Sequence, residues 1–79
     1  MPFGDRVRRL REERYLSQSE LAGKAGISKN TLVRIESGRY AAIPRTVRKL
    51  AEALGVEPRE LASPDELREL RGKRPPRVG

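Results

Sequence analysis

The stretch LSQSELAGKAGISKNTLVRIESG, residues 16–38, carries the start and stop signals of two short helices. In the first helix, Ser17 can cap the N3 amide while Glu20, at N3, reaches back to the Ser17 amide. This helix is expected to end at Gly26, because glycine adopts a positive φ without steric cost. The stretch therefore begins with one short helix that has signals at both ends.

A second cap follows two residues after that stop. Ser28 can begin another helix, which is expected to run to about Glu36, with Gly38 as its stop. Two short capped helices joined by a tight turn predict a helix-turn-helix, here at about residues 17–36. Because such units also occur in proteins that do not bind DNA, the spacing alone leaves the function open.

Helical spacing continues on both sides of this unit, and no alternating run of β-branched residues indicates a strand. Asp5 is the expected cap of an N-terminal helix that ends near residues 14–16. Pro44 suits the first turn of a fourth helix that Gly55 ends, and Pro58 can open a short fifth. The apolar residues expected to face the core are Phe3, Val7, Leu10, Leu21, Ala22, Ala25, Val47, Leu50, Ala51 and Leu54.

The chain beyond the fifth helix divides into two predicted parts. The run SPDE has Ser63 as a cap and Glu66 at N3, which predicts an additional short helix over residues 63–71. Residues 72–79 are basic and proline-rich with almost nothing to bury, so a disordered basic tail is expected. The sequence thus predicts an all-α fold, in which residues 1–62 form a compact bundle of five short helices.

The composition restricts the classes of function. The 79 residues suffice for one small domain, and a net charge of +7 suits a polyanionic partner such as nucleic acid. Without cysteine or histidine, a thiolate nucleophile and the usual zinc site are excluded, and no metal or cofactor is expected. The sequence contains no glycine-rich phosphate loop, and the chain is not expected to be an enzyme. The lack of a long apolar segment or signal peptide predicts a cytoplasmic, nucleoid-associated chain without a membrane partner.

The predicted second helix of the unit has two distinct faces. At about 100° per residue, Leu32 and Ile35 point to one side, toward the core. The opposite arc holds Lys29, Asn30, Val33 and Arg34. These side-chain types match base edges in the major groove, where Arg and Lys donate to guanine, Asn pairs with adenine and Val contacts the thymine methyl. Any amphipathic helix has a polar outer face, so plain solvation remains the other interpretation.

Four motifs together resemble the Cro/repressor-type helix-turn-helix family, also called the xenobiotic-response-element family: LSQSELA, AGIS, RIESG and LAEALGV. The similarity extends over about residues 6–62 without obvious gaps. It implies a lambda-repressor-like DNA-binding domain that acts as a small transcriptional regulator, a repressor, with helix 28–36 in the major groove. It also implies a homodimer on a two-fold-related operator in double-stranded DNA.

The resemblance assigns roles to individual residues. Those implied to contact bases are Lys29, Asn30, Val33 and Arg34. Those implied to contact the DNA backbone are Gln18, Ser28, Thr31, Ser37, Arg39 and Arg45. Arg11 and Glu36 match an internal ion pair of the family, and we assign them a structural role.

Two alternatives and one interface stay open at this point. The same DNA-binding domain occurs in antitoxins of toxin–antitoxin pairs, and a module that binds only a protein partner is also conceivable. Dimers of the family often use the corner of the fourth and fifth helices, where Val56, Leu61, Leu67 and Leu70 lie. Of these, Leu61 is expected to belong to the monomer core instead.

Overall fold

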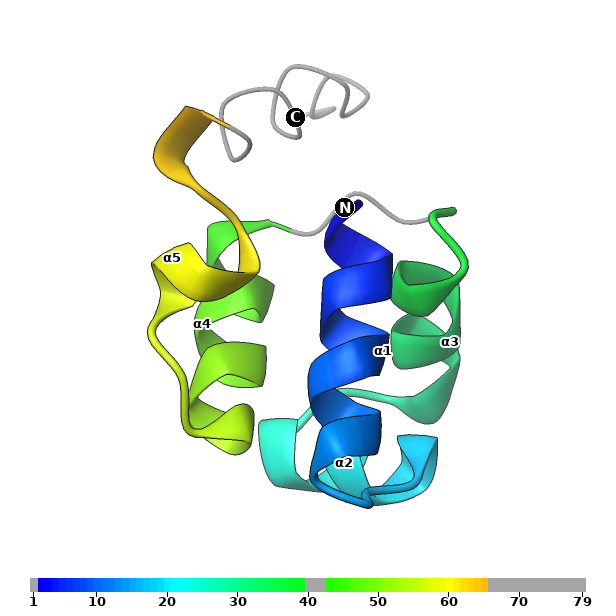
Figure 1. The fold of residues 1–79 in the computed structure, drawn as a ribbon. Helices are drawn as coiled ribbons and strands as arrows, with labels where there is room; N and C mark the ends of the chain where they lie inside the picture. The colour runs from blue at the N-terminus through cyan, green and yellow to red at the C-terminus, as the bar shows by residue number, and fades with distance from the viewer. Residues whose placement is uncertain (1, 40–42, 66–79) are drawn as a thin grey trace.

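The computed structural model describes residues 2–39 and 43–65, and this part of the chain is all-α (Figure 1). Its five helices are α1 (Phe3–Glu13), α2 (Gln18–Ala25), α3 (Lys29–Glu36), α4 (Pro44–Leu54) and α5 (Pro58–Leu61). The predicted class, a bundle of five short helices, is confirmed. Pro64 and Asp65 are helical, but the rest of the additional helix and all of the predicted tail lie outside the described residues.

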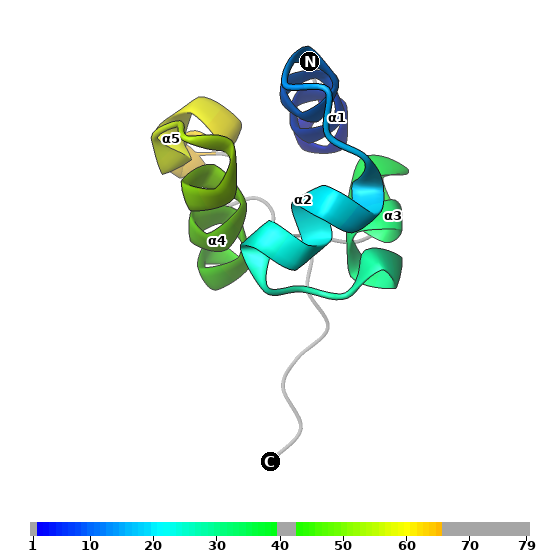
Figure 2. The same cartoon turned by 90° about the horizontal axis from the view of Figure 1, so that it is seen from below.

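α2 joins the two halves of the bundle. In Figure 1, α1, α3 and α4 run side by side, and α2 lies across their lower ends. Figure 2 shows α2 between α3 on one side and α4 on the other, and α2 packs on both. α1 packs on α3, while α5 packs on α4 and α1. α3 therefore has α1 and α2 along its inner side.

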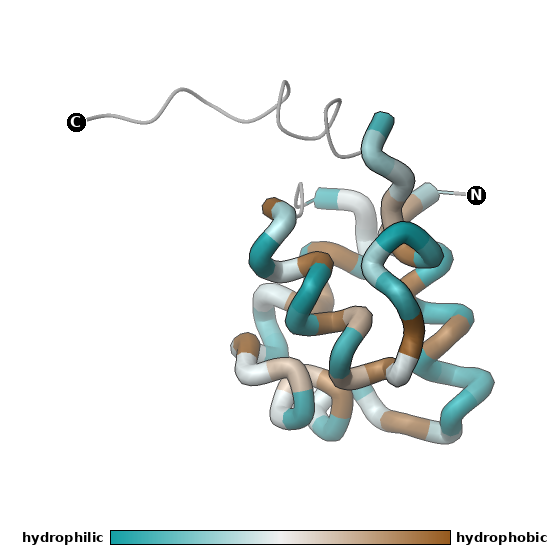
Figure 3. Tube along the Cα trace, turned by 90° about the vertical axis from the view of Figure 1, so that its left-hand side faces the viewer, coloured by the Kyte–Doolittle hydropathy of each residue, from teal (hydrophilic) through white to brown (hydrophobic). Residues whose placement is uncertain are grey.

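The core is aliphatic apart from one phenylalanine. Figure 3 shows hydrophobic and hydrophilic segments alternating along the helices, as amphipathic helices require. The buried apolar residues are Phe3, Val7, Leu21, Ala22, Ala25, Leu32, Ile35, Val47, Leu50, Ala51, Leu54, Leu61 and Ala62. The predicted core face is confirmed, except that Leu10 is only partly buried against it. Leu61 belongs to the monomer core, as expected, while Leu67 and Leu70 lie outside the described residues.

The helix ends follow the local signals. The Ser17 amide donates to Glu20 Oε1 at 2.8 Å, and the Glu20 amide donates to Ser17 Oγ at 3.0 Å, which completes the predicted capping box. Gly26 has a φ of 71° and ends α2 in the left-handed region that glycine occupies without strain. Pro44 opens α4 as predicted. No helix in the described ranges has the length and apolar character needed to cross a membrane.

One predicted cap is wrong. α1 begins at Phe3, with Pro2 in the N-cap position, so Asp5 lies in the first turn instead of before it. The earlier start buries Phe3, and burial of such a side chain is worth about 1.5–3 kcal/mol, more than the roughly 1 kcal/mol of a capping side chain. Asp5 still lies near the positive end of the helix dipole, which favours its negative charge.

Candidate nucleic-acid interface

α3 is held in the bundle by one face. Leu32 and Ile35 are 0% and 1% exposed, as the helical wheel predicts for its inner side. At its start, the Thr31 amide donates to Ser28 Oγ at 3.1 Å, and the Ser28 hydroxyl donates to Thr31 Oγ1 at 2.8 Å. The helix is thus anchored by packing and capped by a side chain, and its outer face takes no part in either.

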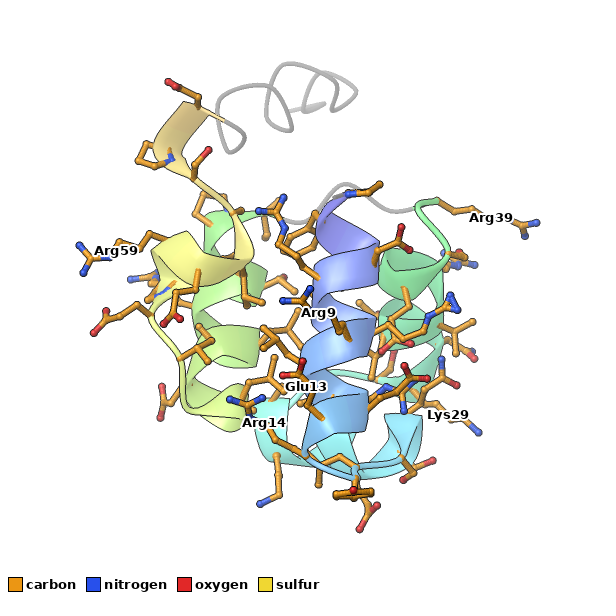
Figure 4. All side chains as sticks on the ribbon, viewed as in Figure 1. Arg9, Glu13, Arg14, Lys29, Arg39 and Arg59 are labelled. Atoms are coloured by element: carbon orange, nitrogen blue, oxygen red, sulfur yellow. The ribbon has the colours of Figure 1, made fainter. Side chains whose placement is uncertain are left out.

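The outer face of α3 presents the four residues of the predicted arc. Lys29, Asn30, Val33 and Arg34 are all exposed. Val33 is 39% exposed and, with Tyr15, is one of the two exposed large hydrophobic residues in the described part of the chain. The Lys29 side chain extends away from the bundle in Figure 4. Within residues 2–39 and 43–65, the polar groups of these side chains have no hydrogen-bond or ion-pair partner, so they are available to a ligand.

The six residues implied to contact a DNA backbone lie in several elements. Gln18 begins α2, Ser28 and Thr31 flank the start of α3, Ser37 and Arg39 follow its end, and Arg45 lies in the first turn of α4. The Arg39 side chain points away from the bundle (Figure 4). The Ser37 hydroxyl donates to the Arg34 carbonyl at 3.0 Å, so in this arrangement Ser37 has no O–H left to donate to a phosphate.

A buried ion pair connects α1 to the last turn of α3. Arg11 Nε donates to Glu36 Oε2 at 2.8 Å, and Arg11 Nη2 donates to Glu36 Oε1 at 3.0 Å. The Arg11 Nη1 group donates to the Leu16 carbonyl at 2.8 Å. The side chains are 12% and 4% exposed, and the hydrogen bonds that Arg11 donates to the Glu36 carboxylate raise the pKa of Arg11. The pair implied by the resemblance is therefore present, and every nitrogen of the guanidinium is in use.

Gln18 joins this ion pair. Its Nε2 group donates to Glu36 Oε1 at 3.2 Å, which ties the start of α2 to the end of α3. Sequence reasoning missed this partner, which lies 18 residues away in the chain. Because the amide has a second N–H, Gln18 keeps one donor for a ligand while Glu36 holds the other.

A surface hollow of about 380 Å³ lies beside the ion pair. Its lining comes from α1 (Arg8, Arg11 and Glu12), the start of α2 (Gln18) and the end of α3 (Val33, Glu36 and Ser37). Because Val33 also belongs to the outer arc, the hollow adjoins the exposed face of α3. Sequence reasoning missed Arg8, whose place at this hollow depends on the packing of α1 against α3.

These features define the class of protein. Two capped helices meet at a tight turn, and the second exposes cationic, amide and apolar side chains on one face, which is the arrangement of a helix-turn-helix domain. The family model described as a helix-turn-helix domain matches residues 2–63, and the chain belongs to this family. The resemblance inferred from the four motifs is confirmed.

Known relatives are regulators. The chain is 47% identical over 55 residues to the HTH-type transcriptional repressor RghR of Bacillus subtilis, covering 68% of this chain and 41% of that protein. It is 42% identical over 64 residues to the cryptic phage CTXphi transcriptional repressor RstR of Vibrio cholerae, covering 81% and 58%. The chain thus spans about half the length of the curated relatives it matches.

A solved structure has the same fold. The restriction-modification controller protein C.AhdI from Aeromonas hydrophila aligns with a TM-score of 0.73 at 41% sequence identity. The alignment covers 75% of this chain and 89% of that chain. The likeness therefore extends over most of both chains.

Proposed function

We propose that this chain binds double-stranded DNA in a sequence-specific way and acts as a transcriptional regulator, a repressor, with α3 in the major groove. The observation that carries the proposal is the outer face of α3, which is exposed and has free polar groups, while the inner face of the helix is buried in the core. An α-helix fits the width of the major groove, where each base pair presents a distinct pattern of donors and acceptors. The names of RghR and RstR support the repressor sense.

Base reading falls to the four residues of the arc. Arg34 donates to guanine through both arms of its guanidinium, Lys29 donates to guanine as a point charge, and Asn30 pairs with adenine. Val33 contacts a thymine methyl. Each good two-point contact discriminates against a wrong base by about 1–3 kcal/mol.

The DNA backbone is held by the surrounding residues. Arg39 and Arg45 supply charge, and Gln18 supplies its free N–H, without reading sequence. Around the start of α3, the Ser28 hydroxyl donates to Thr31, so the Thr31 hydroxyl proton is directed away from Ser28 and toward a phosphate. Because these contacts release counterions, binding weakens steeply as salt rises.

A single domain makes few base contacts, so the proposal includes a homodimer on a two-fold-related operator. Two copies of α3 would enter successive turns of the major groove, about 34 Å apart. The DNA partner places the chain in the cytoplasm, with the nucleoid. No relative named above is an antitoxin, and copurification of a second small protein would be needed to favour that alternative.

Selection from a random duplex library at about 0.15 M salt, near the physiological ionic strength, tests the proposal. The wild-type protein is compared with Arg34→Ala and with Arg9→Ala, a control that removes an exposed arginine from α1. We expect wild type and the control to enrich the same palindrome, and Arg34→Ala to lose preference at one position of each half-site. A random wild-type pool from a folded protein would contradict base reading and indicate a protein partner.

A further inference from the structure

α1 presents a stripe of three residues to α3. Gly4, Arg8 and Arg11 lie at i, i+4 and i+7, so they share one helical face. Gly4 lies against the backbone of Ile35 and Glu36, and Arg11 binds the Glu36 carboxylate. Since the residues on either side of it both contact the end of α3, Arg8 lies along the same seam, and its side chain lines the hollow.

The two arginines of this stripe differ in what they can still bind. Arg11 is nearly buried and donates to Glu36 and to the Leu16 carbonyl. Arg8 is exposed, and its guanidinium has no hydrogen-bond or ion-pair partner among the described residues. Of the two cations that line the hollow, Arg8 is therefore the one with donors to offer.

The hollow also contains a neutral donor of fixed orientation. Because Glu36 holds one N–H of Gln18, the amide cannot turn freely, and Gln18, which lines the hollow, keeps its second N–H as a donor. Val33 places the hollow next to the outer arc of α3. A group that enters here meets a cation and an amide donor while α3 lies in the major groove.

We infer that the hollow between α1, α2 and α3 binds one backbone phosphate of DNA, and that Arg8 supplies its charge while Gln18 donates a hydrogen bond. This inference rests on the proposed function and adds a contact from α1. A planar guanidinium with free donors forms short, charge-assisted hydrogen bonds to phosphate oxygens. Arg11 contributes by holding Glu36, which in turn holds Gln18, and not through a contact of its own.

Two acidic side chains, Glu12 and Glu36, line the hollow, and their negative charges repel an anion. The charge of Glu36 is compensated by Arg11, but Glu12 has no ion-pair partner among the described residues. Glu12 lies one turn after Arg8 on α1, so its field weakens the attraction that Arg8 exerts on a phosphate. Removing the charge of Arg8 and removing the charge of Glu12 should therefore change DNA affinity in opposite directions.

The test is a fluorescence anisotropy titration of two labelled duplexes, the palindrome that wild type enriches and a scrambled duplex of equal length. The proteins are wild type, Arg8→Ala, Arg8→Lys, Glu12→Gln and Arg9→Ala. Arg9 is a matched control, since it neighbours Arg8, is 60% exposed and pairs with Glu13. Far-ultraviolet circular dichroism and the urea midpoint establish that each variant is folded.

We expect Arg8→Ala to weaken binding to both duplexes and to reduce the slope of log K against log salt by about 0.9 per protomer. Equivalently, the ratio of the Kd of Arg8→Ala to that of wild type should fall about 3.5-fold for each bound protomer between about 0.05 and 0.2 M salt, which is about 12-fold for a dimer. Arg8→Lys should keep the wild-type slope, Arg9→Ala should leave affinity and slope unchanged, and Glu12→Gln should bind more tightly.

The outcomes separate the inference from the proposed function. If wild type binds but Arg8→Ala keeps the slope of Arg9→Ala, the phosphate site is wrong and the proposed function stands. If Arg8→Ala loses affinity only for the palindrome, Arg8 contacts a base, which also overturns the inference. If wild type binds neither duplex at about 0.05 M salt, where phosphate contacts are strong, both proposals fall.

Discussion

Arg11 and Glu36 lie 25 residues apart in the chain, yet their side chains meet through two hydrogen bonds of 2.8 and 3.0 Å. The contact joins the last turn of α1 to the last residue of α3, and Gln18 of α2 adds a third hydrogen bond to the same carboxylate. One buried carboxylate thus connects three helices. Because each partner neutralises the other, removing one leaves the other charge buried and unpaired.

We predict that Arg11→Met destabilises the fold by about 3 kcal/mol, the lower end of the range for a buried pair, since the Arg11 side chain is 12% exposed. The measurement is urea unfolding followed by circular dichroism. The double variant Arg11→Met/Glu36→Leu should lose much less than the sum of the single losses, because no unpaired charge remains. Additive losses would show that the two side chains stabilise the fold independently.

Gly4 permits the close approach of α1 and α3. A Cβ at this position would overlap the Ile35 carbonyl oxygen and lie 3.2 Å from two backbone atoms of Glu36. We predict that Gly4→Ala destabilises the protein by about 2 kcal/mol, although alanine is the better helix former. Thermal unfolding measures the change.

Gly23 offers the matched control for this prediction. It lies in the last turn of α2, and an added Cβ would meet no atom within 4 Å. Gly23→Ala should therefore stabilise the protein by about 0.5–1 kcal/mol, the ordinary gain in an open helix. The same sign for both alanine variants would mean that α1 and α3 can separate at little cost.

Tyr15 has an unusual backbone conformation for its residue type. Its φ is 55°, and its side chain is 94% exposed. The left-handed region costs a residue with a side chain about 1–2 kcal/mol. Glycine avoids this cost, but it also makes the unfolded chain more flexible, which offsets part of the gain in stability. We predict that Tyr15→Gly stabilises the protein by about 0.5 kcal/mol in urea unfolding. Tyr15→Ala keeps the Cβ and should give no gain; an equal gain would assign the effect to the ring.

The capping box of α2 makes the stability of the protein depend on pH through Glu20. The hydrogen bonds from the Ser17 amide and hydroxyl lower the pKa of Glu20 below its ordinary value of 4.5. A lowered folded-state pKa contributes stability above the unfolded value, and this contribution disappears as the pH falls through the folded value. The stability difference between wild type and Glu20→Gln should accordingly be present near neutral pH and vanish in acid. Carboxyl-carbon NMR of Glu20 checks the shift; a midpoint at or above 4.5 would contradict it.

The hydroxyls of Thr31 and Ser37, at the two ends of α3, should contribute differently to DNA affinity. Ser37 donates its proton to the Arg34 carbonyl, whereas Thr31 accepts from Ser28 and keeps its proton for a phosphate. We predict that Thr31→Val weakens binding by about 1–2 kcal/mol, and that Ser37→Ala changes it little. Anisotropy titrations on the selected duplex measure both. A larger loss for Ser37→Ala would show that its hydroxyl turns toward DNA in the complex.

The helices, their ends and their inner faces could be predicted because their signals act over short distances. A cap such as Ser17 with Glu20 or a stop such as Gly26 satisfies amides and carbonyls within one turn. Asp5 shows the limit of this reasoning. Its capping potential is local, but the start of α1 was decided by the burial of Phe3 in a core that distant helices build.

The sequence by itself determined the two capped helices, the amphipathic pattern and the outer arc of α3, since each follows from hydrogen bonds and periodicity within a few residues. The tertiary structure decided which helix meets which. In the folded protein, Gly4 lies against the backbone of α3, and Gln18 donates to Glu36. Arg8 lies there at the hollow between α1, α2 and α3 as its free cation. These relationships span 10 to 32 residues of chain, and no local signal encodes them because they exist only once α1, α2 and α3 pack together.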